Sequence, residues 1–225
     1  MKKTLTKHQT IQQNVKYNDL INDTAYSEIL SVNHAEIKSV VLAEIENNLG
    51  WARIANMYQI TGVLAFVLGT FKAFMPFFVT REYVFLLWLG IGLLFTFSVL
   101  IALHELIHVA AYKLIGAKNL SFGFIWHKFL FFVQSDYEVL NYKQFKFIAL
   151  APAVVVGIVS FLGMIIFYNQ PPFFFFLPIF AFHSIFCSGD FGLLCFFQNR
   201  PELEIVTFDV KSEGKAYFYG KKINE

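Results

Sequence analysis

The sequence predicts an all-α polytopic membrane protein with about four transmembrane helices, a small β-hairpin or re-entrant element and a short β tail. Three observations predict this class. Of the 225 residues, 56% are hydrophobic and only 15% are charged, whereas a water-soluble domain carries about 25% charged residues. The mean hydropathy is +0.54. Four separate stretches are apolar enough to cross a bilayer, which takes about 20 residues in a helix.

Composition also excludes other classes of protein. The net charge of +2 is close to neutral, so bulk charge does not favour a nucleic-acid-binding surface. The two cysteines, Cys187 and Cys195, both lie inside an apolar run, and two cysteines do not make a disulfide framework. We therefore expect the lipid bilayer, and not nucleic acid, to be the partner of this chain.

Residues 1–50 are predicted to form a polar N-terminal segment. Apolar side chains recur at near-helical spacing between positions 26 and 50, at Leu30, Ile37, Val41 and Ile45, with charged residues between them. This pattern predicts an amphipathic helix that ends at Gly50. The sequence leaves two places for this helix, on the membrane interface or packed against the rest of the protein.

Residues 51–197 are predicted to form a four-span membrane domain. The expected spans cover residues 52–71, 83–115, 147–168 and 173–197. The second span is longer than a bilayer requires because its helical pattern continues past the apolar part to Gly116, a residue typical of helix ends. We therefore expect this helix to protrude from the membrane by two or three turns.

The connecting segments carry strand signals. Residues 118–135 are rich in strand formers and contain a glycine, which is typical of a short hairpin or re-entrant segment. The tail, residues 198–225, alternates apolar and polar residues over 203–219 around a central turn. This alternation predicts a small β-hairpin.

The distribution of Lys and Arg predicts the orientation in the membrane. Residues 1–53, 113–146 and the tail from 198 hold six, five and five of them, whereas 72–83 holds two and 169–172 none. Basic residues accumulate in cytoplasmic segments. We therefore expect an integral protein of the cell membrane with both termini and residues 113–146 in the cytoplasm.

One motif carries chemistry: His104-Glu105-Leu106-Ile107-His108, an HExxH pattern near the end of the second span. On a helix, positions i and i+4 lie on one face, so both imidazoles can bind one Zn²⁺ at about 2.0–2.1 Å. Glu105 lies beside the two ligands and can act as a general base. Ionisable residues in apolar helices indicate function, although a polar patch buried for helix packing is the alternative.

A catalytic zinc usually takes a third protein ligand, and Asp190 in the fourth span is the predicted one. Counted from the outer end, His104 lies about 31 Å and Asp190 about 26 Å along their helices at 1.5 Å per residue. Both therefore lie at similar depth, near the cytoplasmic face. A lone aspartate at this depth is costly unless it is paired or bound to a metal.

Three other residues remain candidates. His183 shares a helix face with Asp190 but lies about 10 Å away along an unbroken helix, so it is expected to touch a ligand or the substrate instead of the metal. It could join Asp190 as a ligand only if Ser188-Gly189 broke the helix. Asp136 and Glu138 lie in the cytoplasmic segment and could approach the site. His127 and Cys187 are expected to have no role in it.

These motifs resemble the core of the site-2 protease group of intramembrane zinc metalloproteases. A closer likeness, over roughly residues 80–220, is to the bacterial membrane proteins called putative zincin peptidases. It is carried by the HExxH motif, by Ala151-Pro152 at the entry to the next span, by Ser188-Gly189-Asp190 and by Arg200-Pro201 before the tail. Site-2 proteases usually carry Asp before Gly, the reverse of the order here.

The resemblance implies an intramembrane zinc metallopeptidase that hydrolyses peptide bonds of membrane-associated proteins or peptides near the cytoplasmic face. It further implies that residues 118–135 pair with an unwound substrate strand. The alternatives are a non-catalytic zinc-binding membrane protein that acts as a binding or regulatory partner, and a zinc hydrolase of lipids or prenylated peptides. The presence of Glu105 favours an enzyme, since a structural zinc needs no base beside its ligands. The oligomeric state is not predicted.

Overall fold

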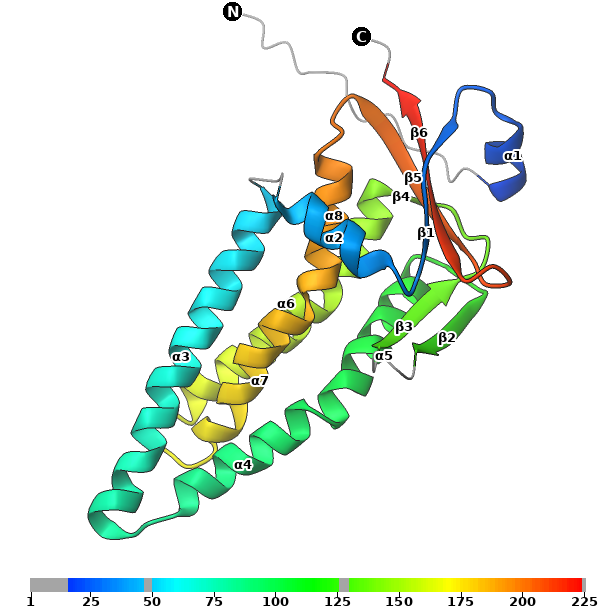
Figure 1. Ribbon diagram of the computed structural model, residues 1–225. Helices are drawn as coiled ribbons and strands as arrows, with labels where there is room; N and C mark the ends of the chain where they lie inside the picture. The colour runs from blue at the N-terminus through cyan, green and yellow to red at the C-terminus, as the bar shows by residue number, and fades with distance from the viewer. Residues whose placement is uncertain (1–15, 47–49, 126–129, 224–225) are drawn as a thin grey trace, which may run out of the picture.

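The computed structural model describes residues 16–46, 50–125 and 130–223. It consists of a bundle of long helices with a four-stranded antiparallel sheet and a two-stranded sheet at one end (Figure 1). In chain order the elements are α1 (Tyr17–Asn22), β1 (Ser27–Asn33), α2 (Ile37–Glu46), α3 (Trp51–Thr80), α4 (Val84–Thr96), α5 (Val99–Leu114), β2 (Leu120–Ile125), β3 (Leu130–Ser135), β4 (Leu140–Asn141), α6 (Tyr142–Ile166), α7 (Phe173–Phe186), α8 (Ser188–Gln198), β5 (Leu203–Val210) and β6 (Lys215–Lys222).

In the described residues, three helices are long and apolar enough to span a membrane: α3, α6 and the run of α7 and α8, which counts as one helix. The bent pair α4–α5 brings the number to four if it counts as one span. Helix α7 packs against α3, α4 and α6 and forms the centre of the bundle. The predicted all-α protein with about four spans is thus confirmed in part, as a mostly helical protein with three to four helices that could span a membrane and with small antiparallel sheets. The orientation in the membrane stays a prediction.

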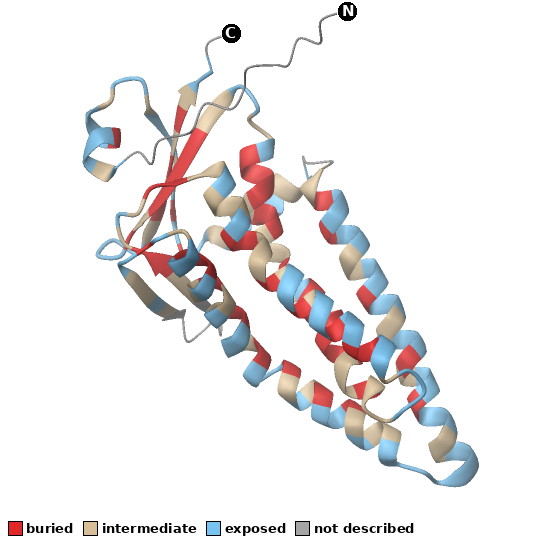
Figure 2. Cartoon of the chain, turned by 180° about the vertical axis from the view of Figure 1, so that it is seen from behind, coloured by how far each residue is buried: buried red, intermediate tan, exposed pale blue. Residues whose placement is uncertain are grey.

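The outer faces of the long helices are apolar and exposed (Figure 2). On α3, Leu68 and Phe71 are 69% and 68% exposed, and Leu94 on α4 is 73% exposed. Exposed apolar side chains over so large an area are typical of a surface that contacts lipid. The helices meet one another through buried small residues, including Gly62 and Gly92.

The second predicted span, 83–115, is not one straight helix. It is interrupted between Thr96 and Val99, and the two halves, α4 and α5, differ in direction by 47°. The buried hydroxyl of Thr96 donates to the carbonyl of Gly92 at 2.7 Å, and that of Ser98 donates to Leu94 at 2.5 Å. Hydroxyls that bond back to the preceding turn bend helices, which gives a physical reason for the break.

The other spans differ from prediction mainly at their ends. Helix α3 continues to Thr80 instead of ending at residue 71, and Arg81 ends it in the left-handed conformation with φ 61°. Helix α6 begins at Tyr142 instead of 147 because Asn141 and Gln144 cap each other's backbone N–H groups. The fourth span is interrupted at Cys187, which separates α7 from α8.

The four-stranded sheet contains strands from both ends of the described chain. Its order is β1-β6-β5-β4, with every neighbouring pair antiparallel. The predicted hairpin over 203–219 is confirmed as β5–β6. Within the segment predicted as a short hairpin, residues 120–125 and 130–135 pair as the antiparallel strands β2 and β3. The predicted helix over 26–50 is only partly right, because residues 27–33 form strand β1 and only α2 is helical there.

The sheet packs directly on the end of the bundle. Phe196 and Phe197 at the end of α8 pack with Val32, Ile205 and Phe218 of the sheet in one buried cluster. Strand β4 leads without a break into α6, and β3 lies against α5. The ends of α5, α6 and α8 are thereby held against the strands, and the predicted site residues lie in this region.

Candidate metal centre

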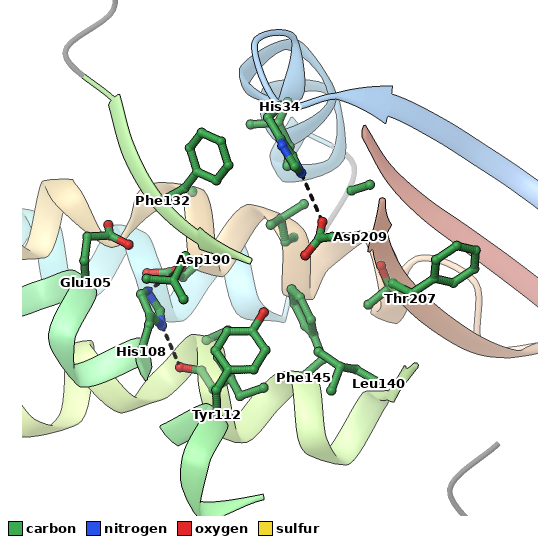
Figure 3. A pocket seen from close by; sticks show the side chains of 18 of the residues that line it. His34, Glu105, His108, Tyr112, Phe132, Leu140, Phe145, Asp190, Thr207 and Asp209 are labelled. Carbon is green, nitrogen blue, oxygen red and sulfur yellow. Dashed lines mark hydrogen bonds and ion pairs between the residues drawn. The ribbon is translucent and has the colours of Figure 1, made fainter. Parts of the chain in front are cut away.

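The two histidines of the HExxH motif lie one turn apart on the buried face of α5. His104 and His108 are both buried, and their Nε2 atoms are 3.1 Å apart. Asp190 reaches them from the first turn of α8. The Asp190 side chain faces α5, with its carboxylate oxygens near Nε2 of His104 and of His108 (Figure 3).

The three side chains point their donor atoms at a common centre. Asp190 Oδ2 lies 3.5 Å from His104 Nε2, and Asp190 Oδ1 lies 3.4 Å from His108 Nε2. Ligands bound tetrahedrally to zinc at about 2.0–2.2 Å lie about 3.3–3.5 Å from one another. The three separations, 3.1, 3.4 and 3.5 Å, are near this edge length, with a different Asp190 oxygen facing each imidazole.

The second nitrogen of each imidazole is held by a further group. The Nδ1 atom of His108 lies 3.1 Å from the carbonyl oxygen of Ile148 on α6. A carbonyl can only accept, so Nδ1 carries the proton and Nε2 presents a lone pair to the centre. His104 Nδ1 lies 3.1 Å from Nε2 of His183, which is fully buried. Such outer partners orient metal-binding histidines.

Asp190 supplies an independent sign that a cation fits here. Its Oδ2 atom is buried and has no hydrogen-bond partner in the described part of the chain. A buried carboxylate oxygen without a partner is costly. A bound cation between Asp190 and the two Nε2 atoms would remove this cost, so the donor set fits Zn²⁺, with Asp190, His104 and His108 as its ligands.

Glu105 lies beside the donor triangle, the three donor atoms of His104, His108 and Asp190, but its side chain does not point at their centre. It is one residue from His104 and therefore about 100° around the helix. Its carboxylate accepts a hydrogen bond from the backbone of Val133 on β3. Figure 3 shows Glu105 extending towards β3, beside Asp190 and His108. The carboxylate is held next to the centre and is free to take a proton from a group bound there.

A cavity of about 230 Å³ opens beside this centre. Four of its lining residues are His104, Glu105, His108 and Asp190, and most of the others are apolar. The apolar walls come from β3, α6, α8 and the sheet, for example Phe132, Phe145, Leu193, Phe208 and Phe218. The centre therefore faces a partly open, mainly apolar space that can hold a ligand.

A second group of buried side chains could also hold a metal: His104, His183 and Cys187. Cys187 Sγ lies 3.6 Å from His183 Nδ1, and both residues are fully buried. Neither lines the cavity, so an ion held there would not face a substrate. His183 lies beside Nδ1 of His104, on the side of that imidazole opposite the atoms of His108 and Asp190.

The remaining sequence candidates lie elsewhere. The Asp136 carboxylate accepts from the backbone N–H of Lys211 at 2.8 Å. Within the described chain, neither Asp136 nor Glu138 belongs to a group that could hold a metal. His127 lies outside the described residues. Sequence reasoning missed His34 and Asp209, which line the cavity from the sheet, and their separation of 175 positions leaves no local signal.

Comparison with known families covers the same region of the chain. Residues 97–203 match the family model described as putative zincin peptidase. The zincin match contains the HExxH motif, His183 and Asp190, but it ends before Asp209 and excludes His34. A search of curated proteins and a search of solved structures both found no match. The likeness to site-2 proteases stays a prediction.

Proposed function

We propose that this protein is an intramembrane zinc metallopeptidase that cuts membrane-associated protein or peptide substrates near the cytoplasmic face. One observation carries the proposal: the donor triangle of His104, His108 and Asp190 has Glu105 beside it and opens on a cavity. The match of residues 97–203 to the zincin family model supports it.

The residues divide into binding and acid–base roles. His104, His108 and Asp190 would hold the zinc, with His183 and the Ile148 carbonyl orienting the two imidazoles. When bound, zinc would supply a Lewis acid that polarises a carbonyl group and makes water easier to deprotonate. The chain itself provides the base, the shape of the cavity and the exclusion of bulk water.

Glu105 would accept the proton of the attacking water on its carboxylate and pass it to the leaving amine. The hydrogen bond from the Val133 backbone restrains the carboxylate, so its remaining lone pairs face the cavity. General-base assistance of this kind is typically worth about 10²–10⁴-fold in rate. A purely structural metal site would not need a carboxylate at this position.

The substrate would be bound as an extended strand beside β3. In the described residues β3 pairs only with β2, so no strand is paired with its other edge. Phe132 and Val133 of β3 line the cavity. An extended peptide can complete such an edge with main-chain hydrogen bonds. A helical substrate must unwind here, since a helix shields the carbonyl that is attacked.

The test uses the full-length protein expressed in cells with a panel of single-span membrane proteins. We expect wild type to release a shortened product from at least one of them and Glu105→Gln to leave that protein intact. Both proteins, purified in detergent, should contain about one zinc each. Glu105→Gln keeps the size of the side chain and its hydrogen-bonding capacity but cannot accept a proton at neutral pH.

The same experiment addresses the rival function of a zinc-binding membrane protein without catalysis. That function predicts equal behaviour of wild type and Glu105→Gln in every cellular assay, while His108→Ala fails. Equal processing of all substrates by wild type and Glu105→Gln would remove the peptidase proposal and leave the metal site in place.

A further inference from the structure

The wall of the cavity opposite the metal centre carries one polar pair, His34 and Asp209. His34 follows strand β1, and Asp209 lies on β5. His34 Nε2 is 3.0 Å from Asp209 Oδ1, and the two side chains are only 10% and 19% exposed. Figure 3 shows the pair across the cavity from Glu105, His108 and Asp190.

The His34 side chain is held in one position. Its backbone N–H donates to the carbonyl of Gly214 in the β5–β6 turn at 3.0 Å. Its ring packs on Phe132 of β3, with ring centroids 4.6 Å apart. A side chain fixed from three directions loses little entropy when it binds a ligand, which is the condition for an effective contact.

The chemistry of the pair leaves one nitrogen available. A carboxylate can only accept a hydrogen bond, so Nε2 of His34 carries the ring proton and donates a hydrogen bond to Asp209. In the described part of the chain, the other nitrogen, Nδ1, has no hydrogen-bond partner. In neutral His34 this nitrogen is an acceptor, the group that a peptide N–H requires.

A role in folding alone explains the pair poorly. Strands β1 and β5 are already connected through main-chain pairing with β6. A single hydrogen bond between the two side chains adds only modestly to that connection, because in folding it replaces hydrogen bonds to water. Both residues also line the cavity of the metal centre, where their polarity contrasts with the apolar side chains around them.

We propose that His34, held by Asp209, accepts a hydrogen bond from a backbone N–H of the substrate on the far side of the cavity. The space between this pair and the metal centre would then hold an apolar substrate side chain next to the bond that is cut. This inference rests on the proposed function and specifies its substrate class: peptides with an apolar residue beside the cleaved bond.

The test measures binding to the purified full-length protein loaded with Co²⁺, whose visible spectrum changes when a ligand joins the metal. Two probes are compared. Acetohydroxamate is small and reaches only the metal centre, whereas acetyl-leucyl-leucine hydroxamate also fills the cavity. We expect His34→Ala to weaken binding of the longer probe about tenfold, the effect of one lost hydrogen bond, and to change acetohydroxamate binding less than about twofold.

Two further measurements make the result specific to the proposed contact. Replacing the peptide N–H groups of the longer probe one at a time by N-methyl should weaken binding to wild type at one position and have no effect there in His34→Ala. Ser39→Ala is the matched control, because its hydroxyl donates to Glu36 in the turn after His34 without lining the cavity. It should bind both probes as wild type does.

Each other outcome is decisive. If His34→Ala binds the longer probe as wild type does, the inference is wrong while the proposed function stands. If His34→Ala binds both probes equally weakly and melts at a lower temperature, the pair is structural and the inference is again wrong. If neither probe changes the spectrum of wild type, the metal centre itself fails, and the proposed function fails with it.

Discussion

Arg200 and Glu44 form a two-point ion pair between the end of α8 and helix α2. Nη1 and Nη2 of Arg200 lie 3.0 and 2.8 Å from the two carboxylate oxygens of Glu44. The side-chain amide of Asn199 donates to the same carboxylate at 2.7 Å. The pair thereby ties the polar segment before the first long helix to the helix that carries Asp190.

This pair makes the stability of the protein depend on pH. Burial alone would raise the pKa of Glu44, but the hydrogen bonds from Arg200 and Asn199 and the charge of Arg200 outweigh it and hold the pKa below its usual range. A carboxylate with a lowered pKa in the folded state contributes stability above its unfolded pKa and loses it as the pH falls through the folded pKa. The stabilisation should therefore be complete at neutral pH and vanish in acid.

We expect Glu44→Gln to lower the melting temperature in detergent at pH 7 by about 2–4 °C, which corresponds to about 1 kcal/mol for a partly exposed pair. The difference from wild type should shrink as the pH falls below the usual range of a glutamate. Glu46→Gln, an exposed position on the same helix, is the control and should melt as wild type does. A difference that persisted unchanged into acid would contradict the role of this charge.

Gly92 is a second testable position, because α4 approaches α7 there without room for a side chain. A Cβ atom at Gly92 would lie 2.5 Å from the carbonyl oxygen of Phe175 and 2.8 Å from Pro178 Cγ. Gly92→Ala should therefore destabilise the protein by about 1–3 kcal/mol. Gly90→Ala, where nothing lies within 4 Å, should be neutral or gain up to about 1 kcal/mol. Thermal unfolding of both variants in one detergent checks this.

The ligand assignment predicts a hierarchy of zinc loss. His104→Ala, His108→Ala and Asp190→Ala should each remove most of the zinc, measured as metal per protein after purification. Asp136→Ala and Glu138→Ala should keep it. If Glu138→Ala lost the metal and Asp190→Ala kept it, the assignment of Asp190 as the third ligand would be wrong.

His183→Ala should have an intermediate effect. Its imidazole contacts Nδ1 of His104 and does not line the cavity. Loss of an outer partner typically weakens metal binding about 10–100-fold. The variant should therefore bind one zinc in excess metal but release it to a chelator sooner than wild type. A complete loss of zinc at saturation would instead favour the group of His104, His183 and Cys187.

The orientation of the chain is tested by reporter fusions. Fusions after residues 50, 130 and 225 should report the cytoplasm, and one at Glu82, between α3 and α4, should report the outside. The reason is the excess of Lys and Arg on one side. A cytoplasmic signal at Glu82 would reverse the orientation and move the proposed site to the other face.

The parts of the fold that follow from local spacing could be predicted. His104 and His108 share a helix face because they are four residues apart. Counting residues along the two helices predicts Asp190 at the same depth in the membrane. The long apolar runs predicted α3 and α6 by composition alone. None of these inferences depends on which distant segments of the chain pack together.

Features that depend on distant pairing could not be predicted. The spacing of Leu30 and Ile37 fits a helix, yet Leu30 lies in β1, opposite Phe218 of β6. The short pattern suits both structures, and only the presence of β6 decides between them. The contact of His34 with Asp209 depends on the same pairing. The helix break near Thr96 has a hydrogen-bonding cause that composition does not reveal.

Within the described residues, strand β1 has one neighbour in the sheet, β6, which follows every long helix in the chain. A ribosome therefore delivers every long helix, with the HExxH motif and Asp190, before β1 meets this neighbour. Until then the wall that carries His34 cannot be completed. A nascent chain therefore holds the HExxH motif and Asp190 before the cavity beside them has all of its walls.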